Sequence, residues 1–169
     1  MRLFLSKTTP IATESVRALL KSGSIEAETP GEVIADVEAV LTSYLETERE
    51  VNERARELLE RTGRGPSDYA RVRAQMAESK GIKVGDEMLD HLLDQVVLAF
   101  HHSDSVDEIF AEDVAMRRQM APIFKKHMVV DASLDAEVRL QLRHMKEGTS
   151  TWDVEYNRVM EAVRRKRGL

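Results

Sequence analysis

Apolar residues recur along this chain at intervals of three and four, which is the spacing of one face of an α-helix. The clearest run spans residues 33–45 and follows Thr29-Pro30-Gly31-Glu32, a helix start with a Thr N-cap and a Pro at the first helical position. Similar runs predict helices at about 9–22, 30–46, 47–62, 68–80, 86–102, 106–129, 133–146 and 152–167. No segment sustains the alternation of a strand, so we expect no sheet.

Capping and breaking residues place several of these boundaries. Capping boxes occur at 47–50, 105–108 and 150–153, and each is typical of the first turn of a helix. Thr9-Pro10 is expected to open the first helix, and Gly81 is expected to end the fourth. Pro122 falls inside a predicted helix and should kink it near residues 118–121, because proline removes a backbone donor.

The two halves of the chain resemble each other. Tyr69-Ala70-Arg71-Val72 matches Tyr156-Asn157-Arg158-Val159, whereas Ser24-Ile25-Glu26 matches Ser105-Val106-Asp107. Between these motifs a set of apolar positions recurs at one constant offset: Val37, Val40, Leu41, Val51 and Leu59 match Met120, Ile123, Phe124, Leu134 and Leu142. We therefore predict an all-α helical bundle of about eight helices, built from two pseudo-repeats of four helices. The repeats span residues 1–82 and 83–169, as two lobes or as one continuous domain.

Composition narrows the function classes. The chain has 169 residues and no cysteine, which excludes disulfides, thiol catalysis and iron–sulfur ligation. The apolar stretch at its start is too short for a signal peptide, and no run is long enough to cross a bilayer. We therefore expect a cytoplasmic protein that has no membrane association.

Charge is distributed unevenly around a net value of −5. Residues 85–113 contain no Lys or Arg but nine acids: Asp86, Glu87, Asp90, Asp94, Asp104, Asp107, Glu108, Glu112 and Asp113. Residues 114–169 contain twelve basic residues and seven acids. The second half of the chain is therefore strongly dipolar along its sequence, with an acidic part followed by a basic part.

Two groups of residues are candidates for binding a partner. The first is a basic surface that could hold phosphate or an acidic partner, formed by Arg164, Arg165, Lys166, Arg167, Arg117, Arg118, Lys125 and Lys126. The alternative is that the terminal cluster only stabilises the end of a helix. The second group is Trp152 and Tyr156, which are four residues apart and could anchor an interface or fill a core.

Evidence for catalysis or for a cofactor is weak. Glu87, His91, Asp94 and His101 share one helical stripe and are a weak candidate for a metal site, with a solvated helix face as the alternative. No second ligand set accompanies them. His101-His102-Ser103-Asp104 is consecutive, so it cannot form a catalytic relay. We expect no catalytic residues, no cofactor and no enzyme activity.

The C-terminal stretch Glu147-Gly148-Thr149-Ser150-Thr151-Trp152-Asp153-Val154-Glu155-Tyr156 carries a family resemblance, together with the basic tail 164–169 and the opening Leu3-Phe4-Leu5-Ser6-Lys7. The chain resembles a bacterial family known as domain of unknown function 507. Members are similar in length, so the resemblance covers the whole chain. It implies no activity and no site residues.

These observations favour a non-enzymatic protein-interaction or adaptor module. Its acidic and basic parts could bind a protein partner, a second copy of the chain, or each other in cis. The alternative is a nucleic-acid-binding accessory factor that uses the basic surface in residues 114–169. A metalloenzyme built on the stripe from residue 87 to residue 101 is a third hypothesis.

Overall fold

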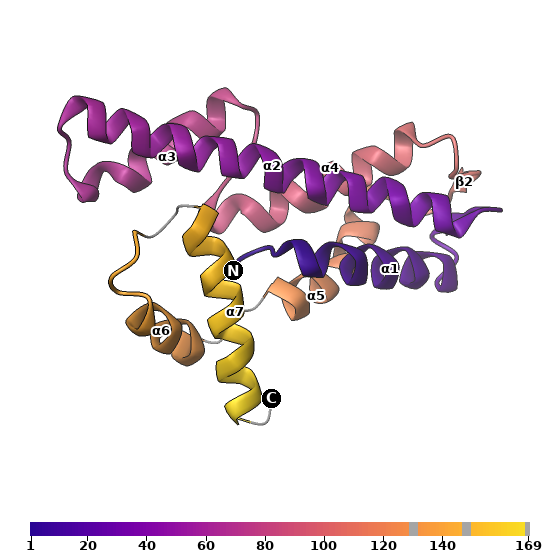
Figure 1. Cartoon of the computed structure of the whole chain (residues 1–169). Coiled ribbons are helices and arrows are strands. Elements are labelled where there is room, and N and C mark those ends of the chain that lie inside the picture. The colour runs from indigo at the N-terminus through magenta and orange to yellow at the C-terminus, as the bar shows by residue number, and fades with distance from the viewer. Residues whose placement is uncertain (129–131, 147–149, 168–169) are drawn as a thin grey trace. The chain divides into compact units, whose positions relative to one another are not determined.

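The structure is a computed structural model that describes residues 1–128, 132–146 and 150–167 (Figure 1). Its elements are α1 (Leu5–Lys21), β1 (Ile25–Glu26), α2 (Pro30–Thr62), the 3-10 turn η1 (Pro66–Asp68), α3 (Tyr69–Ser79), the 3-10 turn η2 (Gly85–Glu87), α4 (Met88–His102), β2 (Glu108–Ile109), α5 (Asp113–Met128), α6 (Ala132–Gln141) and α7 (Ser150–Arg167). The predicted all-α class is confirmed. None of the described helices is both long and apolar enough to span a bilayer.

The chain divides into two compact units, Met1–Val129 and Val130–Leu169. This division differs from the expected one at residues 82 and 83. The reason is that α4 packs against α2, and α5 packs against α1. The first part of the second predicted repeat is therefore built into the same hydrophobic core as the first repeat.

Unit 1 is organised around the buried stripe of α2. Val33, Val37 and Leu41 belong to a core that α1, α4 and α5 complete with residues such as Leu19, Leu92, Phe100, Met116, Met120 and Phe124, all nearly or fully buried. Further along α2, Ala55 and Leu59 form a second cluster with Val72 of α3. Unit 2 is the pair formed by α6 and α7, which pack against each other.

The helices expected at 30–46 and 47–62 form the single helix α2. The described residues therefore form the α-helices α1 to α7, one fewer than the eight that were predicted. Thr47 does not cap a new helix. Its hydroxyl donates to the carbonyl of Ser43, one turn earlier in the same helix. Pro30 begins α2 as predicted, and Gly63 follows its end with a φ of 64°, a conformation that glycine adopts without strain.

Two further predictions about boundaries are wrong. The first helix begins at Leu5 rather than at Thr9-Pro10, because Leu3 is buried and the backbone N–H of Arg2 donates to the carbonyl of Met128. The capping box at 105–108 does not start a helix. It lies before α5, and Asp107 instead accepts a hydrogen bond from the N–H of Glu28 at 2.7 Å.

A short sheet also contradicts the expectation that none would form. β1 and β2 pair in antiparallel register, with Ile25 opposite Ile109 and Glu26 opposite Glu108. Each strand has two residues, which is too short to produce a visible alternation in the sequence. The sheet joins the turn after α1 to the turn after α4.

The buried aromatic side chain of α5 provides a direct test of this core. Phe124 is fully buried in the main core, where α5 packs against α1 and α4, whereas Phe110 is exposed. We expect Phe124→Ala to lower the free energy of unfolding by about 3–5 kcal/mol, because the cavity cannot close completely. We expect Phe110→Ala to change it by less than about 0.5 kcal/mol. Urea denaturation of both variants measures this, and equal effects would contradict the described core.

Candidate functional site

The acidic residues of the segment 85–113 lie on the surface of unit 1, and all nine are exposed or half-exposed. We call them the acidic face. Arg117 of α5 neutralises part of it, since one guanidinium nitrogen lies 3.1 Å from Asp90 and the other lies 2.7 Å from Asp94. The Nε2 atom of His101 lies 2.7 Å from the carboxylate of Asp113. Acidic and basic parts of the chain therefore pair in cis at the junction of α4 and α5.

Three exposed large apolar side chains near the junction of α4 and α5, which we call the apolar patch, were not predicted from the sequence. The patch consists of Leu98, Phe110 and Val114, which are 48%, 59% and 64% exposed. The contact between His101 and Asp113 brings the two segments together, because Leu98 lies one turn before His101 and Val114 follows Asp113. The signal in the sequence was an aromatic residue, Phe110, that stands between the acids Glu108 and Glu112.

The predicted basic surface is divided between the two units. In unit 1, Arg117 is engaged with the acidic face, and Lys126 lies 3.1 Å from the carboxylate of Glu14. The ring of His127 contacts the same carboxylate at 2.9 Å. Both hydrogen bonds lower the pKa of Glu14, and the bond from Lys126 has the larger effect. Arg118 and Lys125 make no ion pair with a described residue.

In unit 2, the terminal basic cluster lies on the last turns of α7. Arg165 and Lys166 are exposed, and Arg164 is half-buried. The side chain of Arg167 lies outside the described part of the structure. Arg164, Arg165 and Lys166 make no ion pair within the described residues, so they remain available for an anionic group or for the helix dipole.

Trp152 and Tyr156 are both buried. Their rings stack with centroids 4.9 Å apart, and the guanidinium of Arg139 lies over the indole at 5.8 Å. The hydroxyl of Tyr156 donates to the carboxylate of Asp135 on α6. The two aromatic residues therefore connect α6 to α7, which corresponds to the alternative of core packing.

The stripe proposed for a metal does not bring its four residues together. Asp94 pairs with Arg117, and His101 pairs with Asp113. His91 is half-buried beside the ring of Tyr44, with centroids 6.0 Å apart. Among the residues that the structure describes, no group of three or more His, Cys, Asp or Glu side chains is arranged to hold a metal ion.

Ser103, in the run of His, Ser and Asp residues, has a structural partner. Its hydroxyl donates to the carboxylate of Asp36 on α2 at 2.5 Å, and its oxygen accepts from the N–H of Ser105. Ser105 donates in turn to Glu32. These bonds hold the end of α4 against the first turns of α2. Asp36, Ser103 and Ser105 also line a surface hollow, together with Ala39, Ala99, His102 and Asp104.

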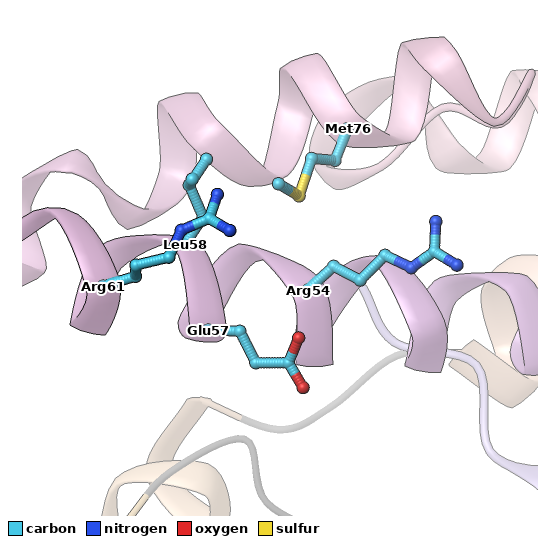
Figure 2. Close-up of a pocket in the computed structure, with 5 residues that line it drawn as sticks. All are labelled: Arg54, Glu57, Leu58, Arg61 and Met76. Atoms are coloured by element: carbon cyan, nitrogen blue, oxygen red, sulfur yellow. The ribbon is translucent and has the colours of Figure 1, made fainter.

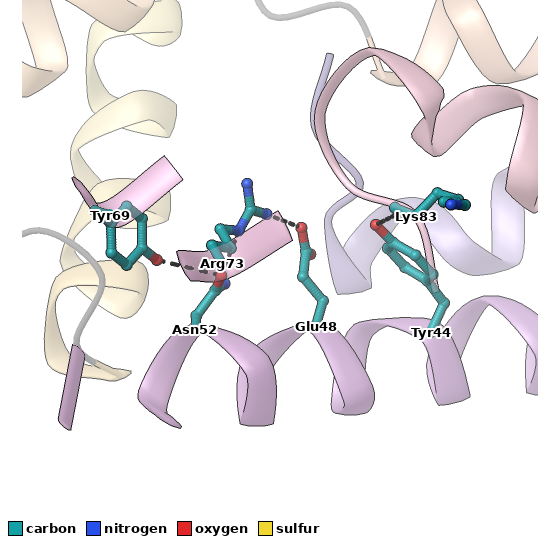
Figure 3. A network of polar contacts seen from close by, with 6 residues as sticks. All are labelled: Tyr44, Glu48, Asn52, Tyr69, Arg73 and Lys83. Carbon is teal, nitrogen blue, oxygen red and sulfur yellow. Dashed lines mark hydrogen bonds and ion pairs between the residues drawn. The ribbon is translucent and has the colours of Figure 1, made fainter. Parts of the chain in front are cut away.

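A polar network fixes α3 on α2 (Figure 3). The guanidinium of Arg73 donates to Glu48 and to Asn52, both at 2.6 Å, and the hydroxyl of Tyr69 donates to Asn52 at 3.3 Å. One turn earlier on α2, Tyr44 donates to the carbonyl of Lys83 at 2.9 Å, and burial raises the pKa of this phenol. The network holds the orientation of the α2–α3 hairpin.

The hairpin also carries a second surface hollow, between α2 and α3 (Figure 2). Arg54, Glu57, Leu58 and Arg61 contribute from α2, and Met76 contributes from α3. The three charged side chains make no ion pair with a described residue. This hollow was not anticipated from the sequence, because its lining depends on how α3 packs.

The environment of His91 gives a pH-dependent stability. Burial lowers its pKa below the ordinary value of 6.5, and Asp94 opposes this effect in part. Below about pH 6.5, His91 is protonated more readily in the unfolded chain than in the folded chain. The free energy of unfolding therefore falls as the pH falls. We expect His91→Gln to lose less stability than the wild type between about pH 8 and pH 5.5 in urea denaturation. An identical pH dependence in both proteins would contradict this assignment.

Comparison with known proteins places the chain in a family. No curated protein matches it. A match to the family described as "Protein of unknown function (DUF507)" extends over residues 1–169 and so covers the whole sequence, as the resemblance of the C-terminal stretch implied. The chain belongs to the DUF507 family.

Proposed function

We propose that this protein is a non-enzymatic protein-interaction module that binds a basic, amphipathic helix of a partner protein through the acidic face and the apolar patch. One observation carries the proposal. Leu98, Phe110 and Val114 expose large apolar side chains on α4, on α5 and in the segment between them, where Asp104, Asp107, Glu108, Glu112 and Asp113 are also found. Apolar patches bordered by charge are typical of protein interaction sites, because water is released from the patch when a partner covers it.

The chemistry of the partner follows from the composition of this surface. Segment 85–113 has no Lys or Arg, and Asp86, Glu87, Asp104, Glu108 and Glu112 make no ion pair with a described residue. A partner with an apolar stripe would cover the patch, and Lys or Arg beside that stripe would face these carboxylates. The charges would raise the association rate and select the partner, whereas burial of the patch would supply most of the affinity.

We also propose that the chain arose by duplication of a four-helix segment. Pro30 and Asp113 begin α2 and α5, and the interval between them equals the offset of the apolar matches between the two halves. The hydrogen bond of Tyr69 with Asn52 has a counterpart in the bond of Tyr156 with Asp135, and Asp135 follows Asn52 by that same interval. These correspondences support the repeat that the apolar positions predict.

The proposed duplication helps to distinguish a binding role of the apolar patch from a packing role. At the offset that aligns Ser24 with Ser105, Leu98 corresponds to Arg17, and at the offset that aligns Pro30 with Asp113, Phe110 and Val114 correspond to Ala27 and Gly31. In this alignment the first copy carries no large apolar side chain at these positions, so the proposed four-helix unit packs without one. The patch therefore supports a role in binding rather than in packing.

The contacts of Ser103 favour a binding protein over a hydrolase. A nucleophilic Ser requires a base at hydrogen-bond distance and an oxyanion site near it. The hydroxyl of Ser103 donates to the Asp36 carboxylate, in a contact that joins α4 to α2, and among the described residues no His ring accepts a hydrogen bond from it, as the catalytic Ser–His pair requires.

Binding of a designed peptide tests the proposed docking surface. The probe is a labelled amphipathic helix with Leu on one face and Lys beside it, compared with the same peptide carrying Glu in place of Lys. We expect the Lys peptide to bind with an affinity that falls about tenfold or more at high salt, and the Glu peptide not to bind. Fluorescence anisotropy measures both peptides.

Variants of the patch identify the surface that the peptide contacts. Phe110→Ser together with Val114→Ser should weaken binding at least about tenfold, because the apolar contact is lost. Leu140→Ser together with Val154→Ser removes two exposed apolar side chains of unit 2 and should leave binding unchanged. The proposal fails if both pairs of variants bind like the wild type, or if the Lys and Glu peptides bind equally.

A second candidate function is binding of nucleic acid by the basic cluster of α7, since Arg164, Arg165 and Lys166 have no acidic partner among the described residues. Under this hypothesis, duplex DNA or structured RNA shifts in an electrophoretic assay. Replacing Arg164, Arg165, Lys166 and Arg167 with Glu should abolish the shift, because phosphate contacts dominate such binding. A shift that persists after this charge reversal would remove the basis of the hypothesis.

A further inference from the structure

The outer surface of α2 carries four charged residues of alternating sign. Glu50, Arg54, Glu57 and Arg61 are spaced by four, three and four residues, and all four lie on the surface. At about 100° per residue, this spacing places them in one row along the helix, which we call the α2 stripe. The core side of α2, marked by Val51, Ala55 and Leu59, faces another direction.

Most charges of the α2 stripe make no ion pair within the described part of the chain. Glu50 lies 3.2 Å from Lys80, in an exposed pair. The other three members make no ion pair with a described residue, although Glu57 and Arg61 are one turn apart. Figure 2 shows the guanidinium groups of Arg54 and Arg61 and the carboxylate of Glu57 held apart along α2. The stripe therefore presents three charges that can pair with another molecule.

We infer that the α2 stripe is a self-association surface, on which a second copy of this chain binds in antiparallel orientation. Along α2 the charges of the stripe alternate in the order acid, base, acid, base. When the same row is read in the opposite direction, each acid falls opposite a base of the original row. When two copies of α2 lie antiparallel, Glu50 faces Arg61 of the other copy, and Arg54 faces Glu57 of the other copy. Each contact occurs twice, as an isologous twofold interface requires.

Spacing and apolar surface support the same arrangement. Glu50 and Glu57 are seven residues apart, as are Arg54 and Arg61, and each separation is about 10.5 Å along the axis. The two rows of charges therefore match in length as well as in sign. Leu58 and Met76 are half-buried beside the stripe. A twofold axis perpendicular to both helices places this apolar flank of the two copies on the same side, where each covers the other.

A basic or an acidic partner protein fits the stripe less well than a second copy does. A uniformly charged partner would leave half of the stripe facing like charges, which is unfavourable. The docking surface for the basic amphipathic helix lies on α4 and the start of α5, so self-association is independent of that proposed function.

Charge exchange in the central pair tests the inference. Arg54→Glu and Glu57→Arg each replace two attractions across the axis with two repulsions, and neither touches the pair of Glu50 and Lys80. We expect the wild type to form a dimer whose dissociation constant rises about tenfold between about 50 mM and 500 mM salt, and each variant alone to be monomeric at the same concentration. An equimolar mixture of the two variants should form a heterodimer, because the opposite charges face each other again. Sedimentation velocity measures all four samples.

Arg17→Glu on α1 is the matched control, since it makes the same charge change at an exposed arginine outside the stripe. It should dimerise like the wild type. Circular dichroism and thermal unfolding establish that every variant is folded, and recovery of the dimer in the mixture separates a lost contact from a damaged fold. The inference is overturned if the wild type is monomeric at all concentrations, if the two variants dimerise like the wild type, or if their mixture stays monomeric.

Discussion

The buried stripe of α2 is the interaction on which the rest of unit 1 depends. Val33, Val37 and Leu41 belong to the main core, and Ala55 and Leu59 belong to the smaller cluster under α3. Because one helix supplies both clusters, the α2–α3 hairpin is a rigid extension of the core rather than a separate lobe. Arg73 and its bonds to Glu48 and Asn52 then hold α3 in place on that extension.

The same continuity shapes the surface. The exposed side of this 33-residue helix, away from its buried residues, carries Glu50, Arg54, Glu57 and Arg61. The acidic face has a different origin. It extends from η2 to the start of α5, and Arg117 neutralises only Asp90 and Asp94. The carboxylates around Phe110 are left facing solvent. The two proposed surfaces therefore arise from separate features of the fold, one from the length of a helix and one from incomplete pairing of charge.

Much of the fold could be predicted because its signals are local. The apolar spacing of α4 marks Leu89, Leu92, Val96 and Phe100 as a core stripe, and all of them are buried. The start of α2 at Pro30 is likewise encoded by the residue itself, since proline fits the first helical position. The capping box at 105–108 shows the limit of such signals. Its residues bind distant partners, Glu28 and Glu32, so the segment closes onto the start of α2 instead of beginning a helix.

The candidate sites depended even more on long-range contacts. A charge pattern could indicate that segment 85–113 is acidic, but not that Arg117 lies within reach of Asp90 and Asp94. By itself, the sequence determined the helical class, most helix positions, the apolar stripes and the family of this protein. The tertiary structure alone decided that Trp152 and Tyr156 are buried, that Phe110 is exposed, and which charges remain unpaired. The physical reason is that helix periodicity acts over a few residues, whereas burial and ion pairing depend on which distant segments meet in space.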